Sequence, residues 1–233
     1  MLLMNKPIGT LGIMGSVPSV PWEFCWSLAQ MIQFDSEFLC KPGEYVHLMA
    51  PSTSYHSSAR NQLVKGMMGD WLLMLDTDHA FDPDIAVRMI QLMKKCDVEV
   101  LSALYRYKVY PHLPVAFHWN EETQGFVTIA ELDWNAMLQQ VSCVGAGCLL
   151  VKRRVFDRIQ NELGEQPFDI IGQWSEDFSL FIRLRRLGIK TYISPLIESY
   201  HLRTHKVTNA DYDRSAVQTM PIPTGGEMVI GKR

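Results

Sequence analysis

The chain has 233 residues, of which 47% are hydrophobic and 20% charged, a composition typical of one globular domain with a sizeable core. Its 22 basic and 25 acidic residues give a formal net charge of −3, which excludes the strong positive field of a typical nucleic-acid-binding protein. The five cysteines form no CxxC pair, and no apolar run has the length of a membrane helix. A cytoplasmic protein with reduced thiols and no integral membrane segment is therefore expected.

The first half of the chain alternates between strand and helix patterns. Short apolar runs predict strands at residues 9–14, 44–50, 71–75 and 98–103. Helical spacing of apolar side chains predicts helices at 22–33 and 57–68. A third helix is predicted after Asp82-Pro83-Asp84, with Asp82 as its N-cap and proline in the first helical position. This order predicts an α/β fold with a mostly parallel sheet flanked by helices.

The second half is less regular. Short strands, some of them antiparallel, are predicted at 115–118, 126–130 and 141–144, with a last strand at 189–193. Helices are predicted at 155–163 and 176–187, the second closed by Gly188. The polar, proline- and glycine-containing residues 206–233 are predicted to form a flexible tail or lid.

Two carboxylates follow the strand at 71–75 directly, Asp76 and Asp78. In an open parallel sheet, ligands bind outside the carboxyl ends of the strands, which is where these side chains should lie. Carboxylate oxygens suit Mg²⁺ or Mn²⁺, which can bridge a diphosphate. The alternative is that both aspartates only form turns and cap the next helix. Because Asp82 already serves as the predicted cap, we favour the metal and phosphate interpretation.

Three motifs, taken in their order, carry a family resemblance. They are Ser58-Ala-Arg-Asn61 with the strand that ends in Asp76-Thr-Asp78, then Gly145-Ala-Gly-Cys-Leu-Leu, then Ser175-Glu-Asp-Phe. The set resembles the family-two glycosyltransferases, which have the A-type, Rossmann-like fold. The resemblance implies a single catalytic domain at residues 1–205. Residues 1–103 would bind the nucleotide sugar, and residues 104–205 would bind the acceptor and catalyse transfer.

The resemblance implies roles for individual residues at the metal and the donor. Asp78, Asp76 and His201 would lie at a Mn²⁺ or Mg²⁺ ion, with His201 a better match than His205. His79 has weaker support and is expected only to pack or hydrogen-bond nearby. The donor, expected to be a UDP-sugar, would contact a further set of residues. These are Ser16, Arg60, Asp76, Asp78, Gly145 and Gly147.

Some of these positions allow two interpretations. Gly145 and Gly147 either let the backbone approach the sugar or mark a bulge in a strand, and the sequence does not separate the two. Residues 15–17 match the place where the family lays the nucleotide base, but a proline-rich turn stands there in this chain. Arg60 is as compatible with a solvated helix position as with contact to the donor.

The acidic pair Glu176-Asp177 matches the catalytic motif of the family, with Asp177 as the general base in a single displacement with inversion. The same residues, after Ser175 as N-cap, also make a sound helix start. The two interpretations are compatible, because the helix dipole would help to keep Asp177 ionised.

The acceptor hydroxyl is not identified by the sequence. One candidate is a hydroxymethylated base in DNA. It would be contacted by Arg106, Lys108, His112, Arg153, Arg154 and Arg203, although each alone fits a solvated surface. The sequence fits two other classes of protein less well. A nucleotidyltransferase needs a basic phosphate-binding loop, and residues 14–18 contain no basic side chain. A non-enzymatic nucleotide-sugar-binding module would lack the aspartate pair or the acidic motif, and both are present.

Overall fold

The computed structural model describes residues 6–15, 20–51, 53, 55–202 and 206–207. Its helices are α1 (Trp22–Phe38), α2 (His56–Gly66), α3 (Ile85–Lys95), α4 (Arg153–Arg158), continued by a π-helical turn (Ile159–Leu163), and α5 (Glu176–Arg186). Its strands are β1 (Lys6–Met14), β2 (Glu44–Met49), β3 (Trp71–Asp76), β4 (His79–Phe81), β5 (Val100–Leu104), β6 (Ala116–Asn120), β7 (Gly125–Thr128), β8 (Gln139–Val141), β9 (Cys143–Val144), β10 (Cys148–Lys152), β11 (Thr191–Leu202) and β12 (Lys206–Val207).

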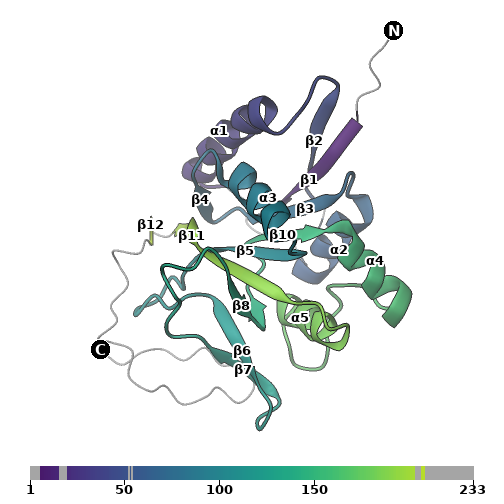
Figure 1. Cartoon of the computed structure of the whole chain (residues 1–233), viewed down its shortest axis with the longest axis vertical. Coiled ribbons are helices and arrows are strands. Elements are labelled where there is room, and N and C mark those ends of the chain that lie inside the picture. Colours follow the sequence, from purple (N-terminus) through teal and green to yellow (C-terminus); the bar gives the residue numbers. More distant parts are fainter. Residues whose placement is uncertain (1–5, 16–19, 52, 54, 203–205, 208–233) are drawn as a thin grey trace.

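Most strands belong to one central sheet, shown in Figure 1. Its main path runs β12-β11-β5-β10-β3-β1-β2, and β4 and β8 pair with β11. β1 is parallel to β2 and β3, and β5 is parallel to β11, whereas β10 lies antiparallel between β3 and β5. The predicted α/β fold, with a mixed, mostly parallel sheet flanked by helices, is confirmed.

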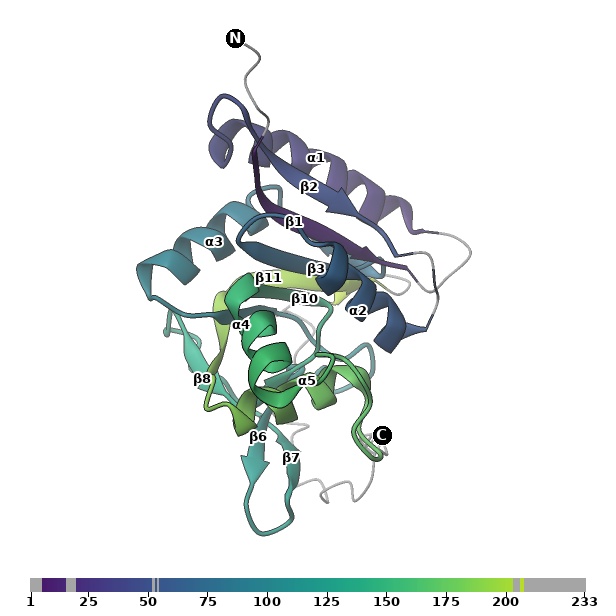
Figure 2. The ribbon, with the colours of Figure 1, turned by 90° about the vertical axis from the view of Figure 1, so that its right-hand side faces the viewer.

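Helices cover both faces of this sheet, as Figures 1 and 2 show. Apolar residues of α1 and α3 form one core cluster, and those of α2, α4 and α5 form the other. Strand β3 supplies both, because its side chains alternate between the two faces. Leu72 and Met74 join the α2 side, and Leu73 and Leu75 join the α1 side. A strand buried on both faces reads as a continuous apolar run, which explains the sequence that precedes Asp76.

A second, smaller sheet of β7, β6 and β9 is antiparallel, as expected for part of the second half. It packs against α5 through aromatic side chains. The ring of Phe178 lies 4.8 Å from that of Phe117 and 5.1 Å from that of Phe126, measured between centroids. This packing fixes the N-terminal turn of α5, which carries Glu176 and Asp177, relative to the sheets.

Several predicted boundaries differ from the structure. The N-cap of α3 is Asp84 and not Asp82, whose backbone carbonyl instead accepts a hydrogen bond from Ile85. Strands β4 and β10 were not predicted: β4 has only three residues, and the buried apolar run of β10 shows no alternation. At α5 the prediction is confirmed, with Ser175 as N-cap and Gly188 in a left-handed conformation (φ +66°) after the helix.

The C-terminal segment starts differently from the prediction. Lys206 and Val207, assigned to the tail, pair with the end of β11 as β12, and residues 208–233 lie outside the described residues. Of the helices in the described ranges, none combines the length and the apolar character that crossing a membrane requires.

Candidate active site

The turn between β3 and β4 carries Asp76, Thr77 and Asp78, and neighbouring strands hold it in place. The Asp76 N–H donates to the carbonyl of Gly147 (2.9 Å), and the Thr77 N–H donates to that of Met14 (2.9 Å). On the other side, the Asp78 carbonyl accepts a hydrogen bond from the Leu202 N–H (2.7 Å). The side chains of Asp76 and Asp78 are 26% and 45% exposed, so both carboxylates remain accessible from a turn with a fixed backbone.

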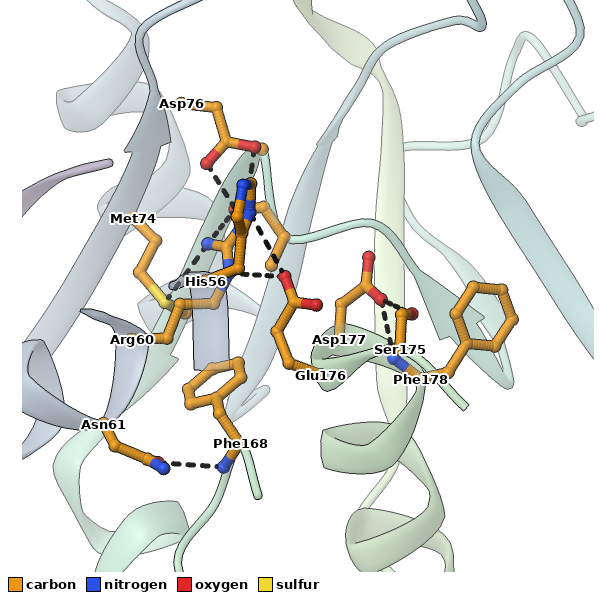
Figure 3. A network of polar contacts seen from close by, with 12 residues as sticks. His56, Arg60, Asn61, Met74, Asp76, Phe168, Ser175, Glu176, Asp177 and Phe178 are labelled. Atoms are coloured by element: carbon orange, nitrogen blue, oxygen red, sulfur yellow. Dashed lines mark hydrogen bonds and ion pairs between the residues drawn. The ribbon is translucent and has the colours of Figure 1, made fainter. Parts of the chain in front are cut away.

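A buried arginine joins this turn to the second acidic segment, as Figure 3 shows. Arg60 of α2 is 2% exposed, and its Nη2 lies 3.0 Å from Asp76 Oδ1 and 3.3 Å from Asp76 Oδ2. Its Nε lies 3.4 Å from Glu176 Oε1, and its Nη1 donates to the carbonyl of Ala146 (3.1 Å). One guanidinium therefore neutralises two carboxylates that are a hundred residues apart in the sequence.

Two opposing effects act on the pKa of the Arg60 guanidinium. Burial alone would lower the pKa of Arg60, but the nearby carboxylates of Asp76, Glu176 and Asp177 outweigh it and raise that pKa. Glu176 has a second partner, His56, whose Nδ1 lies 3.5 Å from Glu176 Oε1. Arg60 is thus a structural cation at the centre of the site, and its hydrogen bonds go to protein groups.

Asp177 lies beside this network in the first turn of α5. Its Oδ1 accepts hydrogen bonds from the Ser175 hydroxyl and from the Phe178 N–H (2.8 Å). Burial, and then the neighbouring charge of Glu176, raise the pKa of Asp177 above its usual value, against the effect of these bonds. The helix dipole was expected to favour the ionised form of Asp177, but the effect of burial on its pKa is larger. A carboxylate with a raised pKa is a better proton acceptor once it is ionised.

Asp78 lies within a group that contains both nearby histidines. In the described part of the chain, Asp78, His79 and His201 are the side chains with metal-ligand atoms all within 4.8 Å of one another. His79 and His201 are cross-strand partners in β4 and β11, and their ring centroids are 4.3 Å apart. Lys108 Nζ binds Asp78 Oδ2 at 2.5 Å. Although burial opposes ionisation, this bond and the two imidazoles lower the pKa of Asp78.

The two imidazoles are both shifted towards their neutral form. Burial lowers the pKa of His79 well below its ordinary value, and burial also lowers that of His201. His201 Nδ1 lies 2.5 Å from the backbone carbonyl of Arg106, so this nitrogen carries the proton and Nε2 has the free lone pair. A histidine that binds a metal is usually neutral, with one ring nitrogen donating to a carbonyl and the other free to bind the ion.

The predicted glycines Gly145 and Gly147 are buried under Tyr105 and His79. A Cβ atom at Gly145 would lie 1.9 Å from the Tyr105 hydroxyl oxygen, and one at Gly147 would lie 2.6 Å from His79 Nε2. The Gly147 N–H donates to the Tyr105 hydroxyl oxygen (3.2 Å). Close packing against these two rings accounts for both glycines, and contact with a donor sugar stays a prediction.

The structure thus gathers most of the predicted site residues at one edge of the sheet. Arg60 connects Asp76 to Glu176, whereas Asp78 pairs with His201 and His79. Ser16 lies outside the described residues. The Arg60–Glu176 ion pair and the contact of Lys108 with Asp78 were not expected from the sequence. His79, expected only to pack or hydrogen-bond nearby, lies in the group of possible ligand atoms with Asp78 and His201.

An α/β sheet with acidic side chains at the carboxyl end of a central strand defines a class of proteins that bind a ligand at this edge. The comparison with protein families gives the particular assignment: the model of "Glycosyl transferase family 2" matches residues 33–160, more than half of the chain. The chain belongs to this family and is a glycosyltransferase. No curated protein sequence matches it.

Two solved structures show the same fold. "Crystal Structure of A197 from STIV" superposes with a TM-score of 0.56 at 17% sequence identity, covering 83% of this chain and 85% of that one. "Crystal structure of GalNAc-T7 with UDP, GalNAc and Mn2+" superposes with a TM-score of 0.56 at 11% identity, covering 86% of this chain and 44% of that one. Both likenesses support the A-type glycosyltransferase fold.

Proposed function

We propose that this glycosyltransferase moves a sugar from a nucleotide-diphosphate sugar to an acceptor hydroxyl at the edge of the sheet where β3 ends. The observation that carries the proposal is the Arg60 bridge between Asp76 and Glu176. It holds the acidic turn from residues 1–103 against the acidic helix start from residues 104–205. A donor held at the first segment would then face a base on the second.

The side chains at the turn fit a divalent metal. Asp78 supplies a carboxylate oxygen, and His201 supplies a neutral imidazole. The Nδ1 atom of His201 is hydrogen-bonded to the Arg106 carbonyl, which orients the ring. Mn²⁺ accepts this oxygen and nitrogen combination, and Mg²⁺ accepts the oxygen. The metal would neutralise the negative charge that develops on the departing diphosphate. The GalNAc-T7 structure, which has the same fold, contains Mn²⁺ and UDP, which supports both the ion and a UDP-sugar donor.

The proposed role of Asp76 is to bind the donor, and it is not the general base. Arg60 orients its carboxylate while about a quarter of the side chain stays exposed. A carboxylate at this position would accept hydrogen bonds from the ribose hydroxyls of the donor. Ser16, on the loop after β1, remains a proposed contact to the nucleotide.

Asp177 is the proposed general base. It would take the proton of the acceptor hydroxyl as that oxygen attacks the anomeric carbon. The bond from that carbon to the diphosphate breaks, and the diphosphate leaves with the electron pair. A single displacement of this kind inverts the anomeric configuration. Glu176, paired with Arg60 and His56, would hold the α5 N-terminus in position for this step.

The positions of the basic side chains bear on DNA as a candidate acceptor. Arg106 is buried over the Trp134 ring, and Arg153 donates to the carbonyls of Gly69 and Met67. Arg154 pairs with Glu99, and Arg203 lies outside the described residues. Each described arginine of this set therefore has a partner within the protein, and Lys108 pairs with Asp78. These contacts give no support to a DNA acceptor, and the proposal extends only to an acceptor hydroxyl.

A thermal-shift screen of nucleotide sugars tests the proposed function directly. We expect one donor to raise the unfolding temperature only when Mn²⁺ is also present, because Asp78 and His201 would hold the metal and its charge would offset that of the diphosphate. Asp78→Asn should remove this joint effect, whereas the matched exposed control Asp157→Asn on α4 should retain it. The absence of stabilisation by every donor tested, with and without Mn²⁺, would contradict the proposal.

A further inference from the structure

The side chain of His79 contains a buried nitrogen without a partner. His79 is completely buried, and its Nε2 has no hydrogen-bond partner. Nearly all buried polar atoms in proteins are paired, so this one needs an explanation such as an ion. Its other nitrogen, Nδ1, lies 2.8 Å from the Ser199 hydroxyl oxygen, which is itself buried. The unpaired nitrogen is therefore held in a fixed direction.

That direction leads to Asp78 and His201. Nε2 of His79 lies 3.8 Å from Asp78 Oδ1, a spacing that two ligands of one metal ion can adopt. Lys108 occupies the other oxygen of Asp78, Oδ2, which leaves Oδ1 on the side of the imidazoles. The antiparallel register of β4 and β11 places His79 opposite His201, so both rings project from the same face of this ribbon.

Two further features support His79, and not Asp76, as a ligand: Gly147 leaves space beside His79 Nε2, and Arg60 binds Asp76. A side chain at residue 147 would place its Cβ 2.6 Å from His79 Nε2, so Gly147 leaves that nitrogen uncovered by a side chain. Both oxygens of Asp76 lie within 3.3 Å of a single nitrogen of Arg60, Nη2. The Asp76 carboxylate is thus paired with the Arg60 guanidinium, and it does not belong to the group of Asp78, His79 and His201.

We propose that His79 is the third protein ligand of the divalent metal, beside Asp78 and His201, and that Asp76 is not a ligand. The site then offers one carboxylate oxygen and two imidazole nitrogens. Nitrogen ligands favour Mn²⁺ and later transition metals over Mg²⁺, which prefers oxygen. The site therefore selects a transition metal. This inference rests on the proposed transferase site, whose metal it specifies.

Electron spin-echo spectroscopy of Mn²⁺ bound to the wild-type protein without nucleotide tests this ligand set. Two coupled imidazole nitrogens are expected, and His201→Asn should leave one. An excess of Mg²⁺ should not displace the Mn²⁺. A single coupled nitrogen in the wild type would overturn the proposal. So would the absence of Mn²⁺ binding, because Lys108 would then be the cation at Asp78.

Variants at the two disputed positions give a second measurement. His79→Asn should raise the dissociation constant of Mn²⁺ about tenfold or more, since even the loss of an outer partner of a ligand has effects of this size. Asp76→Asn should leave it close to the wild-type value, because Asp76 is not in the proposed ligand set. Unfolding curves in the presence of a chelator show which variants fold. If His79→Asn does not fold, the spectrum of the wild type alone decides whether His79 is a ligand.

These measurements separate the inference from the proposed function. Two nitrogens on Mn²⁺ in a protein that binds no nucleotide sugar would support the metal site and contradict the transferase proposal. Donor binding that depends on Mn²⁺, with one nitrogen on the ion, would support the transferase and overturn the role of His79.

Discussion

Arg60 and Asp76 form an ion pair in which the guanidinium is buried and the carboxylate lies at the end of the central strand β3, with 3.0 Å between Nη2 and Oδ1. Arg60 lies in α2 and Asp76 is the last residue of β3, 16 positions further along the sequence. The pair fixes the orientation of the first carboxylate of the site before any ligand binds. A pre-oriented carboxylate loses less conformational entropy when it binds a donor.

Replacing Arg60 by methionine should destabilise the protein by about 3 kcal/mol, because Asp76 and Glu176 then lose their shared counter-ion in a partly buried position. Arg60→Lys should recover part of this loss, since it restores the charge but not the second hydrogen-bond direction. Urea unfolding of the three proteins at neutral pH measures the difference. Equal stabilities of the wild type and Arg60→Met would show that the bridge contributes little.

The sequence predicted the fold better than it predicted the site. Strong local patterns, such as the apolar run 71–75 and the Ser175 helix start, gave the correct elements. Contacts between distant segments left no such pattern. The Arg60–Glu176 pair and the β4–β11 register depend on how the strands are ordered, which local periodicity does not report. For this reason the sequence left two interpretations for Arg60 and predicted only packing or hydrogen bonding near the site for His79.

Asp177→Asn should retain Mn²⁺-dependent donor binding and lower the turnover number by about 10²–10⁴-fold, because an amide cannot accept the acceptor proton. The exposed control Asp157→Asn should turn over normally. Transfer assays alongside thermal shifts with the donor separate the two effects. Wild-type turnover in Asp177→Asn would remove this residue as the base.

The pH dependence of turnover supplies an independent check on Asp177. Burial raises its pKa, and a base works only when it is ionised. The kcat/KM of the wild type, which reports the free enzyme, should therefore fall as the pH is lowered through a value above the ordinary range of aspartate. An acid limb in the ordinary aspartate range would contradict the assignment or the burial.

Gly145→Ala should destabilise the protein by about 1–3 kcal/mol, because its Cβ would lie 1.9 Å from the Tyr105 hydroxyl oxygen. Tyr105→Phe in the same chain should relieve part of this loss, since the blocking atom is the hydroxyl oxygen itself. A double-mutant cycle by urea unfolding measures the coupling. The cycle needs a control for the backbone effect of alanine. Gly125→Ala supplies one, because Gly125 has no positive φ and its Cβ would meet no atom closer than 3.6 Å. Additive effects of Gly145→Ala and Tyr105→Phe would exclude the proposed contact.

Asp35 provides a prediction away from the active site. It lies on the buried face of α1 with Phe24, Ser27 and Met31, it is 2% exposed, and neither carboxylate oxygen has a hydrogen-bond partner. Burial raises its pKa from 3.8 to about 7. Between these values the folded protein holds a proton that the unfolded chain has released. The free energy of unfolding therefore decreases as the pH rises through this window and changes no further, through this group, above it.

Asp35→Asn mimics the protonated carboxyl at every pH and should abolish this decrease. The variant should match the wild type near pH 4 and exceed it near pH 8 by at most about 4 kcal/mol, the equivalent of the pKa difference. Urea unfolding at a series of pH values measures both proteins, and Glu37→Gln on the exposed side of the same helix is the matched control. Parallel pH profiles for the wild type and Asp35→Asn would show that Asp35 is ionised and solvated in the folded protein.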